Sequence, residues 1–212
     1  MIRVLIADDH AIVREGIKRT LADMADIQVV GEAGDGQTLM ALIGGDIADV
    51  VILDLAMPGI PGLELLEDLR RRKPNLPILV LSMYPAEQYA VRAIRAGASG
   101  YINKASPPSE LIAALRSVAS GRRYINPEVA DSLASHLDSS SPRSPHEVLS
   151  NREYEVLCLI AQGKSVGDIA EFLVLSVKTV STYRSRILQK LDRKSTRLNS
   201  SHVTTSRMPS SA

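Results

Sequence analysis

Carboxylates stand at two points where an apolar run of the chain ends. Asp8 and Asp9 directly follow the run that closes at Ala7, and Asp54 follows the run 50–53. If these runs are parallel strands of one sheet, their carboxyl ends lie on the same edge, where such sheets bind ligands. Crowded carboxylates repel one another and offer only oxygen ligands, which suits Mg²⁺. The alternative is a set of solvated strand ends, because acids are common where loops begin.

Two further polar residues follow later apolar runs. Ser82 ends the run 78–81, and Lys104 comes shortly after the run 101–102. By the same reasoning, a hydroxyl and an ammonium group would join the carboxylates at one edge of the sheet. The presence of these two groups favours a ligand-binding site over a set of solvated strand ends.

The elements that must position these residues alternate between apolar runs and helical periodicity over residues 1–121. Several runs are continuously apolar, as expected for parallel strands that are covered on both faces. Between them, apolar residues recur at spacings of three and four, which is typical of amphipathic helices. A five-fold repeat of this kind predicts an α/β fold with a doubly wound, five-stranded parallel sheet. The residues that carry the helical periodicity are Val13, Ile17 and Leu21, and then Leu63, Leu66 and Leu69.

A linker is predicted over residues 122–148. Before it, Ser106 and Pro107 are a typical helix start, and that helix should run to about Gly121. A short helix is expected to begin at Asn126 by the same logic. The stretch 139–145 contains only Ser, Pro and one Arg, which predicts a flexible connection.

Residues 149–191 are predicted to form a small all-α domain of three helices. Ser150 and Glu153 match a capping box ahead of the first helix, which should end at Gly163. Ser165 should open the second helix, and Ser176 should open the third, which would reach Leu191. This spacing is what a helix-turn-helix needs.

The predicted third helix contains four cations and no acidic residue. An apolar stripe is expected through Val177, Val180, Ile187 and Leu191. The opposite face then presents short hydroxyls and a cation, which suit base edges and phosphates in a major groove. The alternative is a solvated basic face with no ligand. The residues of this face are Lys178, Ser181, Thr182 and Ser185.

Composition agrees with a cytoplasmic protein that has no membrane span. No apolar run approaches the length of a transmembrane helix, and the N-terminus lacks the layout of a secretory signal. The single Cys158 excludes an internal disulfide framework. Residues 1–121 contain 12 Lys and Arg against 15 Asp and Glu, a net charge of −3, whereas residues 149–191 contain 6 against 4, a net charge of +2. This mild asymmetry points any nucleic acid towards the C-terminal part.

Residues 1–121 resemble the receiver domains of two-component response regulators. The resemblance implies that Asp54 accepts a phosphoryl group from a sensor histidine kinase, and that Ser82 and Lys104 assist. It also implies that Asp9, Asp54 and the Ala56 carbonyl hold Mg²⁺, with Asp8 acting through water. The motifs that match, in order, are Asp8-Asp9, Asp54-Leu55-Ala56-Met57-Pro58-Gly59, Ser82 and Tyr101-Ile102-Asn103-Lys104.

The chemistry of these residue types agrees with the roles that the resemblance implies. A carboxylate can attack a phosphoryl group if the developing charge is neutralised, and Mg²⁺ and the Lys104 ammonium would do this. Ser82 can donate a hydrogen bond to a phosphoryl oxygen, and Tyr101 would then move inward and repack a surface. The alternative for Tyr101 is a half-buried edge residue. The chain departs from many receivers at Ala105, where they have proline.

Residues 149–191 resemble the LuxR-type helix-turn-helix, so that residues 1–191 as a whole resemble a NarL/FixJ-class response regulator. The resemblance implies binding of double-stranded DNA, with Tyr183 and Arg184 near phosphates, and a homodimer in the parent protein whose C-terminus is intact. Phosphorylation of Asp54 would release the DNA-binding domain and expose dimerisation surfaces. The matching residues are Leu149-Ser150-Asn151-Arg152-Glu153, Val156-Leu157, Ile160-Ala161, Gly163-Lys164-Ser165, Ile169-Ala170, Lys178-Thr179-Val180 and Lys190-Leu191.

The last segment, residues 192–212, departs from the family pattern. It is rich in Ser and Thr where the family has a fourth helix, and we expect it to be disordered. Residues 192–202 resemble the translation of a common sequencing adapter, and we hypothesise that the segment is an artefact that replaces the natural C-terminus. We therefore expect this chain to dimerise and to bind DNA poorly.

Three rival functions remain open from the sequence. A receiver that acts only through protein contacts, with a DNA-binding module impaired by the loss of its last helix, is the first alternative. A phosphatase with an aspartyl phosphoenzyme is disfavoured, because Ala56 stands where such enzymes usually carry a general acid. A quorum-type sensor of small molecules is disfavoured by the acidic residues, and we expect a regulator that is not an enzyme.

Overall fold

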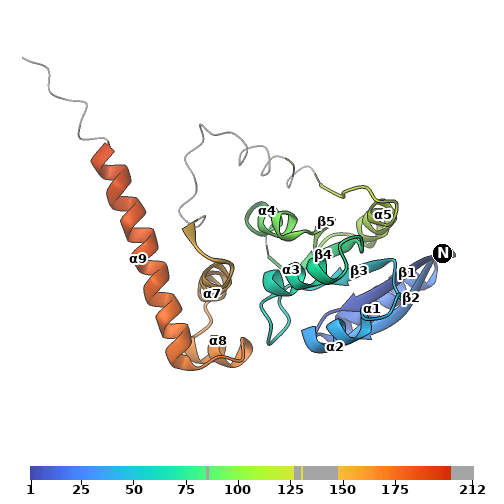
Figure 1. Ribbon diagram of the computed structural model, residues 1–212, viewed down its shortest axis with the longest axis horizontal. Helices are drawn as coiled ribbons and strands as arrows, with labels where there is room; N and C mark the ends of the chain where they lie inside the picture. Colours follow the sequence, from blue (N-terminus) through green and yellow to red (C-terminus); the bar gives the residue numbers. More distant parts are fainter. Residues whose placement is uncertain (85, 127–129, 131–147, 202–212) are drawn as a thin grey trace, which may run out of the picture. The chain divides into compact units, whose positions relative to one another are not determined.

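The computed structural model describes residues 1–84, 86–126, 130 and 148–201. The chain divides into two compact units, Met1–Ser141 and Pro142–Ala212, and each is described by itself. The first unit contains strands β1 to β5 and helices α1 to α5, and the second contains α7 to α9 (Figure 1).

A parallel sheet of five strands forms the centre of the first unit, in the order β2-β1-β3-β4-β5. The order steps outwards in both directions from β1, which is the doubly wound topology that the sequence predicted. The alternating run of strands and helices therefore specified this fold correctly. The strands are β1 (Ile2–Ala7), β2 (Ile27–Ala33), β3 (Val50–Leu53), β4 (Ile78–Ser82) and β5 (Gly100–Asn103).

Both faces of the sheet are covered, which explains why its strands are continuously apolar. Successive residues of a strand point to opposite faces, yet Val4, Leu5 and Ile6 of β1 all have no exposed surface. Apolar residues of α1 and α5 pack with Val4 and Ile6 in one core cluster. The helices of this unit are α1 (Ala11–Ala22), α2 (Gly36–Leu42), α3 (Gly62–Arg72), α4 (Ala86–Ala96) and α5 (Pro108–Ala119).

The predicted helical stripes face the core. Ile17 and Leu21 of α1 are buried, and Val13 packs against the core cluster as a partly buried residue. All three leucines of the second stripe, Leu63, Leu66 and Leu69, are buried in α3.

The start of α5 differs by one residue from the prediction. The N-cap is Pro107 rather than Ser106, and Pro108 is the first helical residue. The reason is the Pro-Pro pair, because a residue before proline is pushed out of the helical region, and Pro107 accordingly has an extended ψ of 149°. Gly121 follows the helix with a φ of +80°, as a C-terminal stop requires.

Three helices form the second unit: α7 (Asn151–Ala161), α8 (Val166–Phe172) and α9 (Val177–Ser201). The predicted capping box of Ser150 and Glu153 is present, and Ser165 forms a second one with Asp168. Gly163 ends the first helix with a φ of +82°. Most of the linker, including the short helix expected from Asn126, lies outside the described residues.

Two predictions about α9 are wrong. The helix does not end near Leu191 but continues through Ser201, so residues 192–201 are helical rather than disordered. No glycine or proline interrupts this stretch, and adding a residue to an existing helix costs far less than starting one. Val177 is not in the buried stripe but 57% exposed, at the first residue of α9, whereas Val180 is buried. The rest of the predicted disordered tail lies outside the described residues.

None of the helices in the described ranges is both long and apolar enough to cross a membrane.

Candidate functional site

An acidic cluster lies at the carboxyl edge of the sheet, where the sequence predicted it. Strands β1 and β3 are neighbours with Ala7 opposite Leu53, so Asp8 and Asp54 leave the sheet side by side. Both are buried with 1% of their surface exposed, and Asp9 is partly buried. One ligand atom from each of Asp8, Asp9, His10 and Asp54 lies within 4.8 Å of all the others.

Lys104 joins this cluster as its buried cation. Its Nζ lies 2.7 Å from Asp54 Oδ2 and 2.6 Å from Asp8 Oδ2. The neighbouring strands β4 and β5 position it, since the Lys104 backbone N–H donates to the Ser82 carbonyl over 2.9 Å. Burial alone would lower the pKa of Lys104, but the Asp54 and Asp8 carboxylates outweigh it and raise the pKa above its usual value. The side chain therefore stays charged.

Burial is the strongest influence on the pKa of Asp54. It raises the pKa of that carboxyl above its ordinary value, although Lys104 and a hydrogen bond from the Ala56 backbone N–H both work in the opposite direction. The Ala56 bond is 3.0 Å long and ends on Oδ1, whereas Lys104 contacts Oδ2. Each oxygen of Asp54 thus has one fixed donor.

Two oxygens of the cluster suit a divalent cation. Asp8 Oδ2 and Asp9 Oδ1 are buried and accept no hydrogen bond of good geometry from the described residues, although Lys104 Nζ and His10 Nδ1 lie 2.6 and 2.8 Å away. Buried polar atoms of this kind are rare unless water or an ion completes them. A set of carboxylate oxygens is what Mg²⁺ prefers. The residues present therefore fit a magnesium ion.

His10 belongs to the cluster, although sequence reasoning missed it. Its Nδ1 lies 2.8 Å from Asp9 Oδ1, its backbone N–H donates to Asp8 Oδ1, and its side chain is 62% exposed. The position directly after Asp9 was the available signal. An imidazole is a poorer ligand for Mg²⁺ than an oxygen, so we assign His10 a contact with Asp9 rather than a place in the ligand set.

The loop after Asp54 is tightly shaped where α3 begins. A Cβ added to Gly62 would lie 2.2 Å from the Leu55 carbonyl oxygen, which no real side chain could do. Only glycine therefore allows α3 to begin against the backbone that follows Asp54.

Ser82 and Tyr101 are both buried near this edge. Ser82 has no exposed surface, and its Oγ accepts a hydrogen bond of 3.2 Å from the Tyr84 N–H. Tyr101 is 1% exposed and donates its hydroxyl to the Tyr84 carbonyl over 2.7 Å. The Tyr84 ring stacks on that of Tyr89 at 4.4 Å. Tyr101 is thus turned inward, and the half-buried alternative for it is wrong.

The predicted nucleic-acid face of α9 is exposed in the second unit. Lys178, Ser181, Thr182, Arg184 and Ser185 are all exposed, while Tyr183 is half-buried at the edge of the face. The opposite side of the helix contacts α7 and α8 through the buried Val180 and Ile187.

Hydrogen bonds within α9 limit what this face can offer. Thr182 donates its hydroxyl to the Lys178 carbonyl over 2.9 Å, and Ser185 donates to the Ser181 carbonyl over 3.1 Å. Both hydroxyls therefore present lone pairs outwards and act as acceptors. Gln189, seven residues after Thr182, is exposed on the same side and was missed, although its helical spacing was a readable signal.

Two ion pairs brace the second unit behind this face. Lys190 of α9 contacts Glu153 of α7 at 2.6 Å, and Glu153 also receives the Ser150 backbone N–H. Arg152 contacts Glu155 at 2.7 Å and donates to the Leu173 carbonyl at the end of α8. The first pair ties α9 to α7, and the Arg152 contacts tie α7 to the end of α8.

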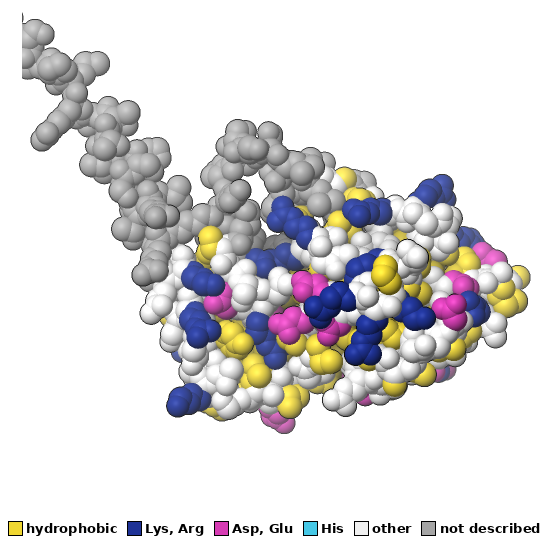
Figure 2. Space-filling model, viewed as in Figure 1, with side chains coloured by type: hydrophobic (Ala, Val, Ile, Leu, Met, Phe, Trp, Pro, Cys, Tyr) yellow, Lys and Arg dark blue, Asp and Glu magenta, His cyan; other side chains and the backbone are white. Residues whose placement is uncertain are grey.

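Elsewhere the surface is mixed in charge. On the face drawn in Figure 2, cationic and anionic side chains are interspersed, with small apolar patches between them. This agrees with a net charge of +1 for the whole chain. Local clusters, rather than the overall charge, must therefore determine where anions bind.

Comparisons with known proteins match both parts of the chain. Residues 4–116 match the family described as "Response regulator receiver domain", and residues 147–198 match "Bacterial regulatory proteins, luxR family". The chain is 40% identical over 193 residues to the response regulator UvrY of Escherichia coli K12, covering 91% of this chain and 88% of that protein. It is 42% identical over 194 residues to the response regulator GacA of Pseudomonas aeruginosa, covering 90% of each. The solved structure of RcsB from Salmonella enterica serovar Typhimurium bound to promoter rprA in the presence of phosphomimetic BeF3- is 31% identical with a TM-score of 0.64, covering 90% of this chain and 92% of that one.

Proposed function

The chain belongs to the NarL/FixJ-class response regulators, which join a receiver domain to a LuxR-type helix-turn-helix, and we propose that phosphorylation of Asp54 controls its binding to DNA. The observation that carries this proposal is the buried Asp54 carboxylate with Lys104 Nζ at 2.7 Å and with Asp8 and Asp9 beside it. We assign the receiver to residues 1–121, the linker to 122–148 and the DNA-binding domain to 149–191.

Asp54 is the phosphoacceptor in this proposal. One of its carboxylate oxygens attacks the phosphorus of a phosphohistidine on a sensor histidine kinase, so that a P–O bond forms as the P–N bond breaks. Lys104 places a positive charge beside the developing negative charge, and Ser82 can turn its hydroxyl towards a phosphoryl oxygen. When bound, Mg²⁺ neutralises charge on the phosphoryl oxygens, and Asp9, Asp54 and the Ala56 carbonyl would hold it, with Asp8 acting through water.

Phosphorylation then acts on a side-chain switch. A hydrogen bond from Ser82 to the phosphoryl group competes with its present bond to the Tyr84 N–H. Because Tyr101 is held by the carbonyl of the same residue, a shift at Tyr84 alters the surface over Tyr101. This change favours a homodimer, in which two copies of α9 bind paired half-sites of double-stranded DNA.

The receiver chemistry is tested by intact mass after incubation with acetyl phosphate and Mg²⁺. The wild type should gain about one phosphoryl mass, and Asp54→Ala should not, because the variant lacks the carboxylate that attacks the phosphorus. The matched control is Asp23→Ala, an exposed aspartate at the end of α1, which should still gain the adduct. An adduct that persists in Asp54→Ala would reject Asp54 as the acceptor.

The DNA-binding half is tested by selection from a pool of random duplex DNA, with and without phosphorylation. We expect a recovered sequence with paired half-sites, and weaker recovery by Lys178→Ala and by unphosphorylated chain. A chain that is phosphorylated yet recovers no sequence would support the alternative of a receiver that acts through protein contacts only.

A further inference from the structure

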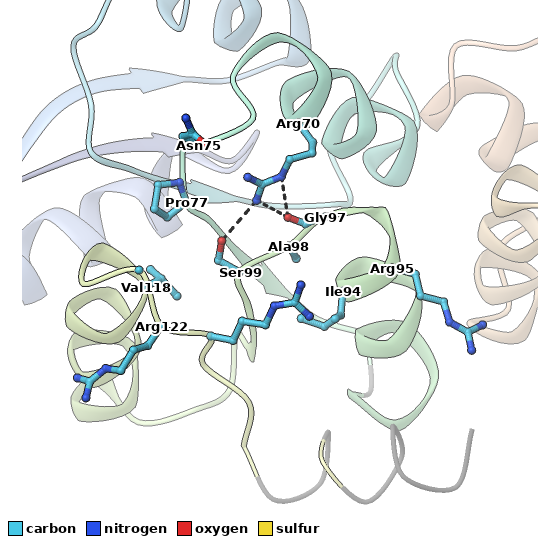
Figure 3. A pocket seen from close by; sticks show the side chains of 12 residues that line it. Arg70, Asn75, Pro77, Ile94, Arg95, Gly97, Ala98, Ser99, Val118 and Arg122 are labelled. Atoms are coloured by element: carbon cyan, nitrogen blue, oxygen red, sulfur yellow. Dashed lines mark hydrogen bonds between the residues drawn. The ribbon is translucent and has the colours of Figure 1, made fainter. Parts of the chain in front are cut away.

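A polar pocket of about 470 Å³ opens at the other edge of the receiver sheet (Figure 3). Pro77 and Ser99, which directly precede β4 and β5, line it, as do the ends of α3, α4 and α5. Asp54, Ser82 and Lys104 all lie at the carboxyl ends of the strands, so the pocket is separated from them by the length of β4. A volume of this size suits a small molecule.

Arg70 is the cation at the centre of this pocket. Its guanidinium points into the pocket and donates to the Gly97 carbonyl, with Nε at 3.1 Å, and to Ser99 Oγ at 3.5 Å (Figure 3). It also donates to the Pro74 carbonyl. All three partners are neutral, and the described residues pair no carboxylate with Arg70. Burial, and then repulsion from Arg123, lower the pKa of Arg70.

The backbone is built to hold Arg70 in this place. Gly97 has a φ of +111°, and a Cβ there would lie 3.0 Å from both Cγ and Nε of Arg70. Glycine therefore permits the turn and leaves room for the arginine across it. The guanidinium is fixed before any ligand arrives, which reduces the cost of binding.

All the charged residues of the lining are cationic. Arg95, Arg122 and Arg123 join Arg70, and no acidic residue contributes to the lining. In Figure 3, Arg95 and Arg122 extend outwards on opposite sides of the pocket. Among the described residues, neither Arg95 nor Arg123 has a carboxylate partner. Four uncompensated guanidinium groups around one cavity create a positive potential that attracts anions.

Ser99 adds a hydrogen-bond donor. Its Oγ accepts from the Ile78 N–H at 3.3 Å and from Arg70 Nη2, but its own proton has no acceptor within the part of the chain that the structure describes. A hydroxyl donor next to a guanidinium fork matches the oxygens of a phosphate group. Ile94 and Val118 leave an apolar wall beside these donors.

We propose that this pocket binds a small phosphate-bearing anion with at least two negative charges. Arg70 and Ser99 contact the phosphate oxygens, and Arg95 and Arg123 turn inwards to neutralise the remaining charge. The proposal does not depend on phosphorylation of Asp54, because the two sites share no residue.

Isothermal titration calorimetry of the full chain with inorganic pyrophosphate and with ADP tests this. The buffer contains a chelator and no divalent cation, so that the acidic cluster at Asp54 repels both probes. We expect saturable binding, and about a tenfold or greater loss of affinity in each of Arg95→Ala and Arg123→Ala, because each removes a charge-assisted hydrogen bond. Tighter binding of ADP than of pyrophosphate would show that the apolar wall contacts an organic group, and equal binding would mark phosphate alone as the ligand.

The matched control is Arg72→Ala, which removes an exposed arginine of α3 outside the pocket. It should bind both probes as the wild type does. The proposal is overturned if neither probe binds, if Arg72→Ala weakens binding as much as Arg123→Ala, or if both pocket variants bind as tightly as the wild type. In that last case, loss of binding in Lys178→Ala would place the anion on α9.

Discussion

At the scale of single residues, Lys104 is the group on which the buried acidic cluster depends. It is the cation that contacts both Asp8 and Asp54, and all three side chains are less than a tenth exposed. A buried ion pair contributes little when intact, but removing one partner leaves an uncompensated charge. The energetic importance of Lys104 thus exceeds that of any surface lysine.

Replacement of Lys104 by methionine should therefore destabilise the receiver by about 3 kcal/mol at neutral pH, because two buried carboxylates lose their common cation. Urea unfolding of the full chain in the absence of Mg²⁺ measures this. Lys73→Met is the control, since Lys73 pairs with Asp46 on the surface and should matter little. Equal stability of the two variants would show that the Asp8 and Asp54 charges are compensated in another way.

The sequence predicted the members of this cluster better than their contacts. Asp8, Asp54 and Lys104 could each be found because each follows an apolar run, and strand ends converge by topology alone. Their pairing could not be found, because which oxygen meets which nitrogen depends on side-chain rotamers within a buried space. The hydrogen bond that holds Tyr101 inward could not be found for the same reason, since its partner is a backbone carbonyl rather than a residue type.

At the scale of elements, the turn between α8 and α9 contains local strain. Val174 has a φ of +53°, in the left-handed region, and is 71% exposed. A β-branched residue is a genuine outlier there, at a cost of roughly 1–2 kcal/mol. Neighbouring hydrogen bonds hold the conformation, because the Leu175 N–H donates to the Ala170 carbonyl over 2.8 Å. The turn keeps its shape despite the residue at its centre.

We therefore expect Val174→Asn to stabilise the second unit by about 1 kcal/mol, since asparagine tolerates this backbone and the valine buries little surface. A trifluoromethyl label on Cys158, the single cysteine, reports urea unfolding of this unit within the full chain. The control is Val177→Asn, which changes another exposed valine, one whose φ is not positive, and should bring no gain. A loss of stability in Val174→Asn would show that the valine makes contacts that outweigh its strain.

The brace between α7 and α9 should make the second unit sensitive to acid. Burial works against ionisation of Glu153, but the Lys190 and Ser150 hydrogen bonds outweigh it and lower the pKa of Glu153 below 4.5. A carboxyl whose pKa is lower in the folded state contributes stability above its unfolded pKa and loses it as the pH falls through the folded value. Glu153→Gln should therefore cost about 1 kcal/mol at neutral pH, and this difference should shrink as the pH falls below 4.5.

The same Cys158 label measures this difference between wild type and Glu153→Gln across the pH range. Glu171→Gln serves as the control, because Glu171 is exposed on α8. If the difference in free energy of unfolding stays constant down to low pH, the packing of the Glu153 side chain, and not its charge, holds α7 against α9.

The ends of helices were predictable where a short local pattern specifies them, and not elsewhere. The capping box at Ser150 and the stop at Gly163 are local signals, and both were confirmed. Pro107 and Pro108 compete for one position, and only the backbone decides between them. The extension of α9 past Leu191 could not be predicted from composition, because a helix that is already formed continues through residues that would not start one.

At the scale of the whole molecule, charge is divided between two units with different tasks. The receiver gathers three carboxylates, Asp8, Asp9 and Asp54, at one site, and the second unit presents a helix face with cations and outward-facing lone pairs. The net charge of +1 hides this division, which the sequence had indicated only weakly. DNA binding by such a chain must come from a few contacts rather than from a general positive field.

Lys178 allows the contribution of a single phosphate contact to DNA binding to be measured. Each phosphate contact adds about one unit to the slope of log affinity against log salt concentration, so a dimer that loses Lys178 from both copies should lose about two units. Fluorescence anisotropy of the phosphorylated chain on its selected duplex, over a range of salt concentrations, gives the slope for wild type and Lys178→Ala. Arg72→Ala removes one charge from each receiver and should leave the slope unchanged. A loss of about one unit would place a single copy on the DNA, and no loss would place Lys178 at a base edge or away from the duplex.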